Sequence, residues 1–133
     1  MVREFVRAAT PAKIRALKDH MAREKAALDT HDAAGGVELL GDFHVRMAEL
    51  MGNEVLAHVL RDLIARSSLI SLMYQRAGAA AHSQEEHVEL VRAIAAKDEK
   101  RAAQLMEDHL RHVEESLAFD RVVPTHDISL ALA

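Results

Sequence analysis

The segment Leu40–Met51 reads LGDFHVRMAELM, and its spacing indicates which kind of fold the chain adopts. Residues three, four and seven apart share one face of an α-helix, whereas neighbours do not. His44 lies on the apolar face of this segment, and its ring nitrogens need polar partners if that face is buried. The other members of the face are Leu40, Phe43, Met47 and either Leu50 or Met51, whereas Asp42, Arg46 and Glu49 fall mostly outside it.

Two further segments repeat this pattern of one imidazole on an apolar helix face. His87 shares its face with Leu90, Val91 and Ile94. His109 shares its face with Ala102, Leu105, Met106, Val113 and Leu117. Antiparallel helices of a bundle point such side chains into one interior, where three converging imidazoles can coordinate one metal ion. A core histidine bonded to a backbone carbonyl or hydroxyl is the alternative for each residue, and the pattern alone leaves both interpretations open.

The composition of the chain favours one all-α domain, an antiparallel bundle of about six helices. The 133 residues are 50% hydrophobic but only 3% aromatic, with 5 Gly and 2 Pro, so the turn signals of a β-sandwich or barrel are missing. The absence of cysteine excludes disulfides and thiolate metal sites. Neither a signal peptide nor a membrane span is visible, which predicts a soluble protein located in the cytoplasm. The net charge of −4 argues against direct binding of a phosphate backbone.

The helices expected from periodicity and capping residues cover most of the chain. Thr10, Asn53 and Asp98 are predicted N-caps, and Ser83–Glu86 has the spacing of a capping box that opens the fifth helix. A loop is expected over Asp29–Gly36, and an extended or partly disordered tail from about Asp120. The predicted helices are Val2–Ala8, Pro11 to about Asp29, Val37–Met51, Asn53 to about Arg76, Ser83 to about Ala96, and a sixth that begins after Asp98.

Two expectations concern which polar and apolar side chains point outward. On the second helix the solvated side is predicted to be formed by Lys13, Arg15, Lys18, Arg23, Glu24 and Lys25. The pairs His20/Glu24 and His58/Asp62 are accordingly expected on polar surfaces. On the fourth helix the side chains predicted to face inward are Leu56, Val59, Leu60, Leu63, Ile70 and Met73 or Tyr74.

Polar residues among the inner positions of the fourth helix are candidates for an effector pocket. Ser67, Ser71 and Tyr74 follow one side of that helix with Arg66 at its edge, which favours recognition of a small carboxylate. Hydroxyls bonded back to their own helix are the alternative. Asn53 and His82 complete the set of candidate effector-binding residues, because His82 alone among the other histidines can approach the three imidazoles.

Several catalytic patterns are absent. The residues three before the core histidines are Gly41, Gln84 and Met106, which excludes the Glu-x-x-His pairs of di-iron bundles. There is no His-Glu-x-x-His motif, phosphate-binding loop or nucleophile elbow. The chain is therefore not expected to be an enzyme. A small three-histidine metalloenzyme that activates water and a metal-free helical interaction module remain as alternatives.

With these residues assembled, the chain resembles the FCD domain, the C-terminal half of FadR-type regulators in the GntR family of bacterial transcription regulators. The resemblance runs from about Ala9 to about Phe119, leaving 120–133 as a tail of the single domain. Its motifs are Gly41-Asp-Phe-His44, Ala48–Asn53, Glu86-His87, Ala93–Asp98, Ala102-Ala103 and Met106–Leu110.

The resemblance implies a divalent metal, commonly zinc or nickel, beside a pocket for a small organic acid. It implies that His44, His87 and His109 are the metal ligands. In the family, an aspartate four residues before the first histidine usually supplies a fourth ligand, but Leu40 stands at that position here. The resemblance also implies a homodimer in which a winged helix-turn-helix, preceding this domain and not present in this chain, binds operator DNA.

Overall fold

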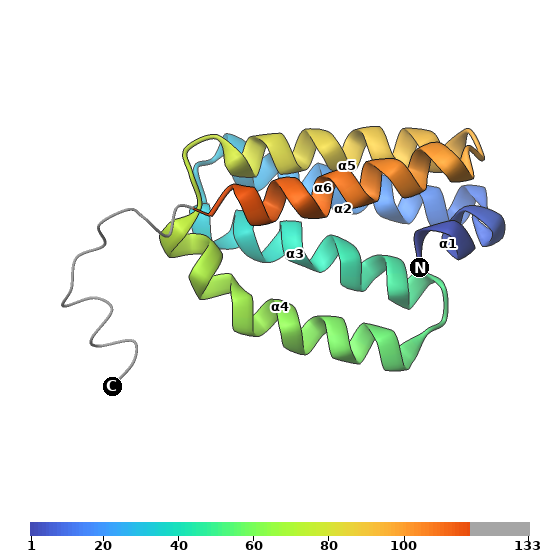
Figure 1. Ribbon diagram of the computed structural model, residues 1–133, viewed down its shortest axis with the longest axis horizontal. Coiled ribbons are helices and arrows are strands. Elements are labelled where there is room, and N and C mark those ends of the chain that lie inside the picture. The colour runs from blue at the N-terminus through green and yellow to red at the C-terminus, as the bar shows by residue number, and fades with distance from the viewer. Residues whose placement is uncertain (118–133) are drawn as a thin grey trace.

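The computed structural model describes residues 1–117, which form an all-α antiparallel bundle (Figure 1). Its core is the group α2, α3, α5 and α6, in which α2 packs on α3 and α5, and α5 packs on α6. The short α1 lies against α6, and α4 lies at one edge against α3. The six helices are α1 (Val2–Ala8), α2 (Pro11–Asp29), α3 (Ala33–Leu50), α4 (Glu54–Tyr74), α5 (Ala79–Ala95) and α6 (Glu99–Glu115).

Side chains cap four of these helices at their N-termini. Thr10, Asp32, Asn53 and Asp98 each accept a hydrogen bond from the backbone N–H three residues later, at 3.0 to 3.2 Å. Such caps satisfy one of the N–H groups that a helix start leaves without an intrahelical partner. The predicted caps at Thr10, Asn53 and Asp98 are confirmed.

The start of α3 differs from the prediction. The helix begins at Ala33 instead of Val37, so the paired glycines Gly35 and Gly36 lie in its first turn. The predicted loop is therefore shorter than expected, because Asp32 accepts the N–H of Gly35 and caps the helix earlier. Gly36 is buried.

The start of α5 also differs from the prediction. The helix begins at Ala79, so Ser83–Glu86 lies inside it and is not a capping box. Gly78 adopts the left-handed conformation that glycine tolerates, with φ of 82°, and the alanines that follow have the highest helix propensity. The earlier start places His82 on α5, one turn before Glu86.

The main core lies between α1, α2, α3, α5 and α6. Its largest fully buried side chains include Phe5, Leu17, Phe43, Met47, Leu90 and Ile94. A separate, smaller cluster of Val45, Ala48 and Ala57 joins α3 to α4, with Leu56, Leu60 and Ile64 packed against it. The helix α4 thus packs on the bundle mainly through α3.

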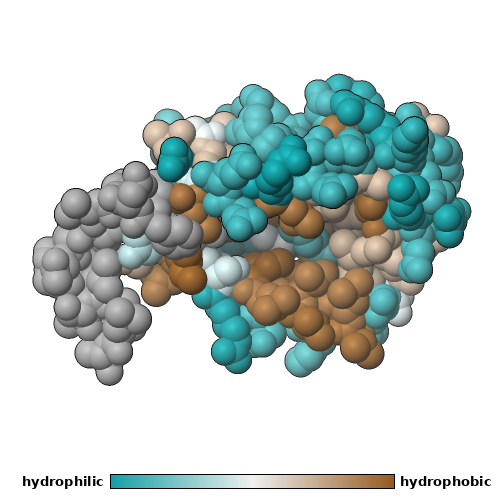
Figure 2. All heavy atoms as spheres, in the orientation of Figure 1, coloured by the Kyte–Doolittle hydropathy of each residue, from teal (hydrophilic) through white to brown (hydrophobic). Residues whose placement is uncertain are grey.

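The prediction for α4 is wrong at three positions. Val59, Leu63 and Ile70 were expected to face inward, but they are exposed to solvent, Leu63 at 56%. The reason is that α4 packs against α3, so only the side of α4 that carries Leu60 and Ile64 is covered. Figure 2 shows the resulting apolar area over α4.

Two further features are the C-terminal tail and the polarity of the helices. The predicted tail from Asp120 falls within residues 118–133, outside the described residues. Between residues 1 and 117, no helix combines the length and the apolar character needed to cross a membrane.

The close approach of α3 and α4 depends on Gly41. A Cβ atom at this position would lie 2.6 Å from Cγ2 of Ile64, whose branched side chain has little freedom to move aside. A Cβ atom at Gly36 would meet Leu28 at 4.0 Å, which is an ordinary contact. We expect Gly41→Ala to lower the melting temperature by circular dichroism, because overpacking costs about 1–3 kcal/mol. The control Gly36→Ala gains about 1 kcal/mol of helix propensity and should not lower it. Equal melting temperatures would contradict this account of the α3–α4 contact.

Candidate metal centre

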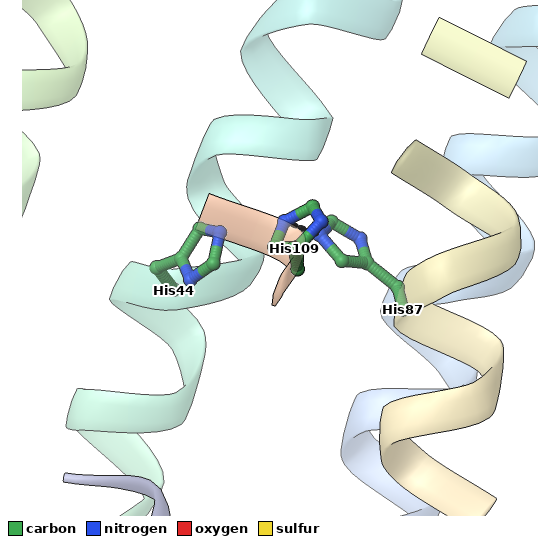
Figure 3. A group of neighbouring side chains, drawn as sticks. All are labelled: His44, His87 and His109. Carbon is green, nitrogen blue, oxygen red and sulfur yellow. Dashed lines mark hydrogen bonds between the residues drawn. The ribbon is translucent and has the colours of Figure 1, made fainter. Parts of the chain in front are cut away.

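Three imidazoles from three helices meet inside the bundle (Figure 3). His44 comes from α3, His87 from α5 and His109 from α6, and one nitrogen of each lies within 4.8 Å of the other two. His87 and His109 are buried, whereas His44 is partly exposed to a pocket. The three residues singled out by sequence are therefore brought together.

The ring of His87 is held on two sides. Its Nδ1 lies 2.8 Å from Oε2 of Glu24 on α2, and the ring stacks on Phe43 with centroids 3.9 Å apart. Glu24 is fully buried, so its predicted place on the solvated side of α2 is wrong. His20 is buried as well, and its Nε2–H donates to the carbonyl oxygen of Leu39 at 2.7 Å.

The sequence does contain a signal for Glu24. It lies three residues after Met21 and four before Leu28, which places it on the apolar face of α2. A carboxylate at such a position has the same significance as an imidazole on an apolar face: it must find a partner inside the protein.

The ring of His109 is held by a second carboxylate that sequence reasoning missed. Nδ1 of His109 lies 3.1 Å from Oε1 of Glu86, and the other oxygen of Glu86 lies 2.5 Å from Nδ1 of His112. Glu86 stands four residues before Leu90, on the apolar side of α5, which is the signal that could have revealed it. Carboxylates that bind the remote nitrogen in this way orient the rings of metal-ligating histidines.

Burial controls the protonation of this cluster. Burial and, to a smaller extent, the neighbouring imidazoles together lower the pKa of His44 to about 4 and the pKa of His87 well below its ordinary value. Burial also raises the pKa of Glu24 to about 8. At neutral pH and without metal, His44 and His87 are therefore neutral, which is the form in which histidine binds metal.

The two carboxylate-bound rings face each other through their other nitrogens. Nε2 of His87 lies 3.1 Å from Nε2 of His109. In the metal-free protein, protonated Glu24 can donate to Nδ1 of His87, and Nε2–H of His87 then donates to His109. If instead both Nδ1 atoms carry hydrogens, two lone pairs meet at Nε2, and only a cation between them makes that arrangement favourable. The donor set of three imidazoles fits zinc or nickel.

Leu40 lies where the resemblance places an aspartate in other family members. It is buried one turn before His44 and lines the same pocket. Its side chain offers no ligand atom. A metal held by the three imidazoles would therefore find no fourth protein ligand at this position.

The pocket beside the histidines has a volume of ≈ 520 Å³, which is within the usual range for small-molecule sites. Ser67 and Ser71 line it, together with Ser68, Gln75 and Ser83. The Ser67 and Ser68 hydroxyls both donate to the carbonyl of Ile64, at 3.3 and 2.7 Å. The apolar part of the lining includes Leu40, Leu60, Ile64, Met106, Leu110 and Val113.

The four other candidate effector-binding residues lie outside this lining. Arg66 forms a salt bridge with Asp62 at 3.1 Å on the exposed side of α4. Asn53 caps α4, and Tyr74 lies at the last position of that helix. His82 lies 3.7 Å from Oε2 of Glu86, on the far side of that carboxylate from His109.

The raised pKa of Glu24 predicts a pH-dependent stability. The carboxyl prefers its proton in the folded state, so its contribution is complete below the ordinary pKa of 4.5 and is lost as the pH rises toward 8. In chelator-treated protein, we expect the melting temperature of Glu24→Gln to rise relative to wild type between pH 5 and pH 8. The control Glu85→Gln changes the same charge at an exposed position and should follow wild type. A constant difference between Glu24→Gln and wild type across this range would refute the assignment.

A comparison with protein families agrees with this architecture. Residues 1–112 match the model of the FCD domain, a stretch that includes the three histidines and both carboxylates. No curated protein and no solved structure matches the chain. A match over this much of the sequence shows membership: the chain belongs to the FCD domain family, which supplies effector-binding domains to GntR-type transcription regulators.

Proposed function

We propose that this domain senses a small carboxylate through a divalent metal ion held by His44, His87 and His109. The observation that carries the proposal is a pair of carboxylates, the buried Glu24 and the partly buried Glu86, which fix two imidazoles with their Nε2 atoms 3.1 Å apart. Rings fixed in this orientation would need little rearrangement to coordinate one cation together. Zinc or nickel suits the donor set, and the metal supplies positive charge at the floor of the pocket.

The lining of the pocket supports a carboxylate ligand bound through the metal. Among the described residues that line it no side chain is a Lys, Arg, Asp or Glu, so among these side chains the histidine cluster would be the charge partner of a carboxylate. The hydroxyls of Ser67 and Ser71 on α4 line the pocket and would bond its other polar groups, the hydroxyl of Ser67 as an acceptor because it donates to the carbonyl of Ile64. The Leu40 position leaves a coordination site for the ligand.

The same lining argues for a sensor instead of a metalloenzyme. Metal-assisted hydrolysis needs a general base beside the activated water. Glu24 and Glu86 are hydrogen-bonded to the Nδ1 atoms of His87 and His109, and neither carboxylate lines the described pocket. In the regulator, ligand binding would alter the arrangement of two attached DNA-binding domains on the operator.

The exposed face of α4 supports a homodimer. Val55, Val59, Leu63 and Ile70 lie at helical spacing along one side and are all exposed, Val55 at 77%. Two copies related by a twofold axis would bury this face against itself, because such an interface uses the same surface on both subunits. The ion pair of Asp62 and Arg66 lies on this same side of the helix, since Arg66 stands three residues after Leu63 and four before Ile70, so the interface would contain both charges.

Metal content tests the first part of the proposal. We expect about one tightly held equivalent of zinc or nickel in untagged protein by elemental mass spectrometry. His87→Ala should lose it, and the control His58→Ala, which removes an exposed histidine on α4, should retain it. Wild-type protein that neither contains nor takes up metal would refute the centre.

Ligand binding tests the second part. Sugar acids and short mono- and dicarboxylates should raise the melting temperature of the metal-loaded protein and not of the chelated protein. Ser71→Ala should reduce the stabilisation by the best acid several-fold, because it removes a hydroxyl from the pocket. Arg66→Ala is the matched control on the same helix and should leave it unchanged, since Arg66 pairs with Asp62 outside the pocket. If Arg66→Ala reduced the stabilisation by the acid and Ser71→Ala did not, the assignment of the acid to this pocket would be contradicted.

Sedimentation velocity tests the dimer. Leu63→Glu should convert the protein to a monomer, because it places a charge within the apolar face. Ala65→Glu adds the same charge on the same helix, about 200° around from Leu63, and should remain a dimer. A dimer that survives Leu63→Glu would place the interface elsewhere.

A further inference from the structure

A second group of metal-binding side chains lies behind the candidate centre. His82 and Glu86 are one turn apart on α5, and His112 approaches them from α6. One ligand atom of each lies within 4.8 Å of the other two. None of the three residues lines the ligand pocket.

Glu86 is the centre of this group. Its Oε2 lies 2.5 Å from Nδ1 of His112 and 3.7 Å from Nε2 of His82, and the two rings have centroids 5.6 Å apart. We propose that His82, Glu86 and His112 form a second divalent-cation site, distinct from the three-histidine centre. Two imidazoles and one carboxylate make a donor set that suits zinc and other first-row transition metals.

The burial of the three residues fits an ion that enters from solvent. The side chains of His82 and His112 are 59% and 39% exposed, whereas that of Glu86 is 16% exposed and fixed by its bond to His109. The fixed carboxylate positions one ligand, and the two exposed rings have room to rotate onto the ion. Further coordination positions remain open to water.

The two sites share Glu86. Its Oε1 bonds Nδ1 of His109, a ligand of the first centre, while its Oε2 belongs to the second site. A cation at Oε2 draws charge from the carboxylate, so Nδ1–H of His109 meets a weaker acceptor and His109 becomes a weaker ligand. Repulsion between the two cations acts in the same direction. A cation in either site therefore lowers the affinity of the other site for its own cation. This coupling rests on the proposed function, whereas the second site does not.

Zinc titration of the untagged full chain by isothermal calorimetry tests the site. Wild type should bind two equivalents, and His112→Ala and His82→Ala should each bind one. The control His58→Ala should bind two. If His112→Ala binds as many equivalents of zinc as wild type, the second site is overturned. Circular dichroism confirms folding, and loss of fold at either exposed histidine would itself contradict its placement on the surface.

A variant of the first centre separates the two proposals. His44→Ala should lose one equivalent and keep the one that depends on His112. If His44→Ala binds as much zinc as wild type while His112→Ala binds less, the first centre fails and the second site stands. If His44→Ala loses its equivalent and His112→Ala loses none, the reverse holds.

The affinity of the remaining site tests the coupling. Reciprocity requires that each ion weakens the other by the same factor. The dissociation constant of the zinc site that remains in His44→Ala should therefore be at least about fivefold lower than that of the second equivalent bound by wild type. Equal affinities would mean that Glu86 does not transmit the presence of one ion to the other.

Discussion

The buried hydrogen bond between Glu24 and His87 is the interaction on which the centre of this bundle depends. It joins α2 to α5 where both side chains are buried, and a buried carboxyl group without a partner would be costly. Because His87 also stacks on Phe43, the same ring connects α2, α5 and α3. Apolar packing fills the volume around it, but this bond determines how the histidine is rotated. The remaining Glu24 oxygen, Oε1, has no hydrogen-bond partner within residues 1–117, so the acid is held on one side only.

The main features of the fold follow from spacing in the sequence. Apolar periodicity located all six helices, and the N-cap side chains at Thr10, Asn53 and Asp98 gave three helix starts. The three histidines were found because each interrupts an apolar face. Their convergence required only that the helices pack side by side with those faces inward.

The errors have physical causes. Glu24 was assigned to the surface by its charge, although its position between Met21 and Leu28 placed it in the core. The face of α4 was assigned to the core by its composition, because periodicity shows which residues share a face and not whether a neighbour covers it. The role of Glu86 depends on how α5 lies beside α6, since its two oxygens contact two histidines of α6, and a single sequence does not contain that distance.

The helix α4 has two faces with different surroundings. One carries Ser67 and Ser71 into the ligand pocket, and the other carries the exposed apolar residues that form the proposed dimer surface. It packs against α3, and Gly52 and Gly78, both with positive φ and with space around them, stand beyond its two ends. In the proposed regulator, α4 would therefore contact both the small molecule and the neighbouring subunit. A ligand that shifts α4 would alter the proposed subunit contact directly, because Ser67 stands four residues after Leu63 and three before Ile70, so the signal would need no relay through the core.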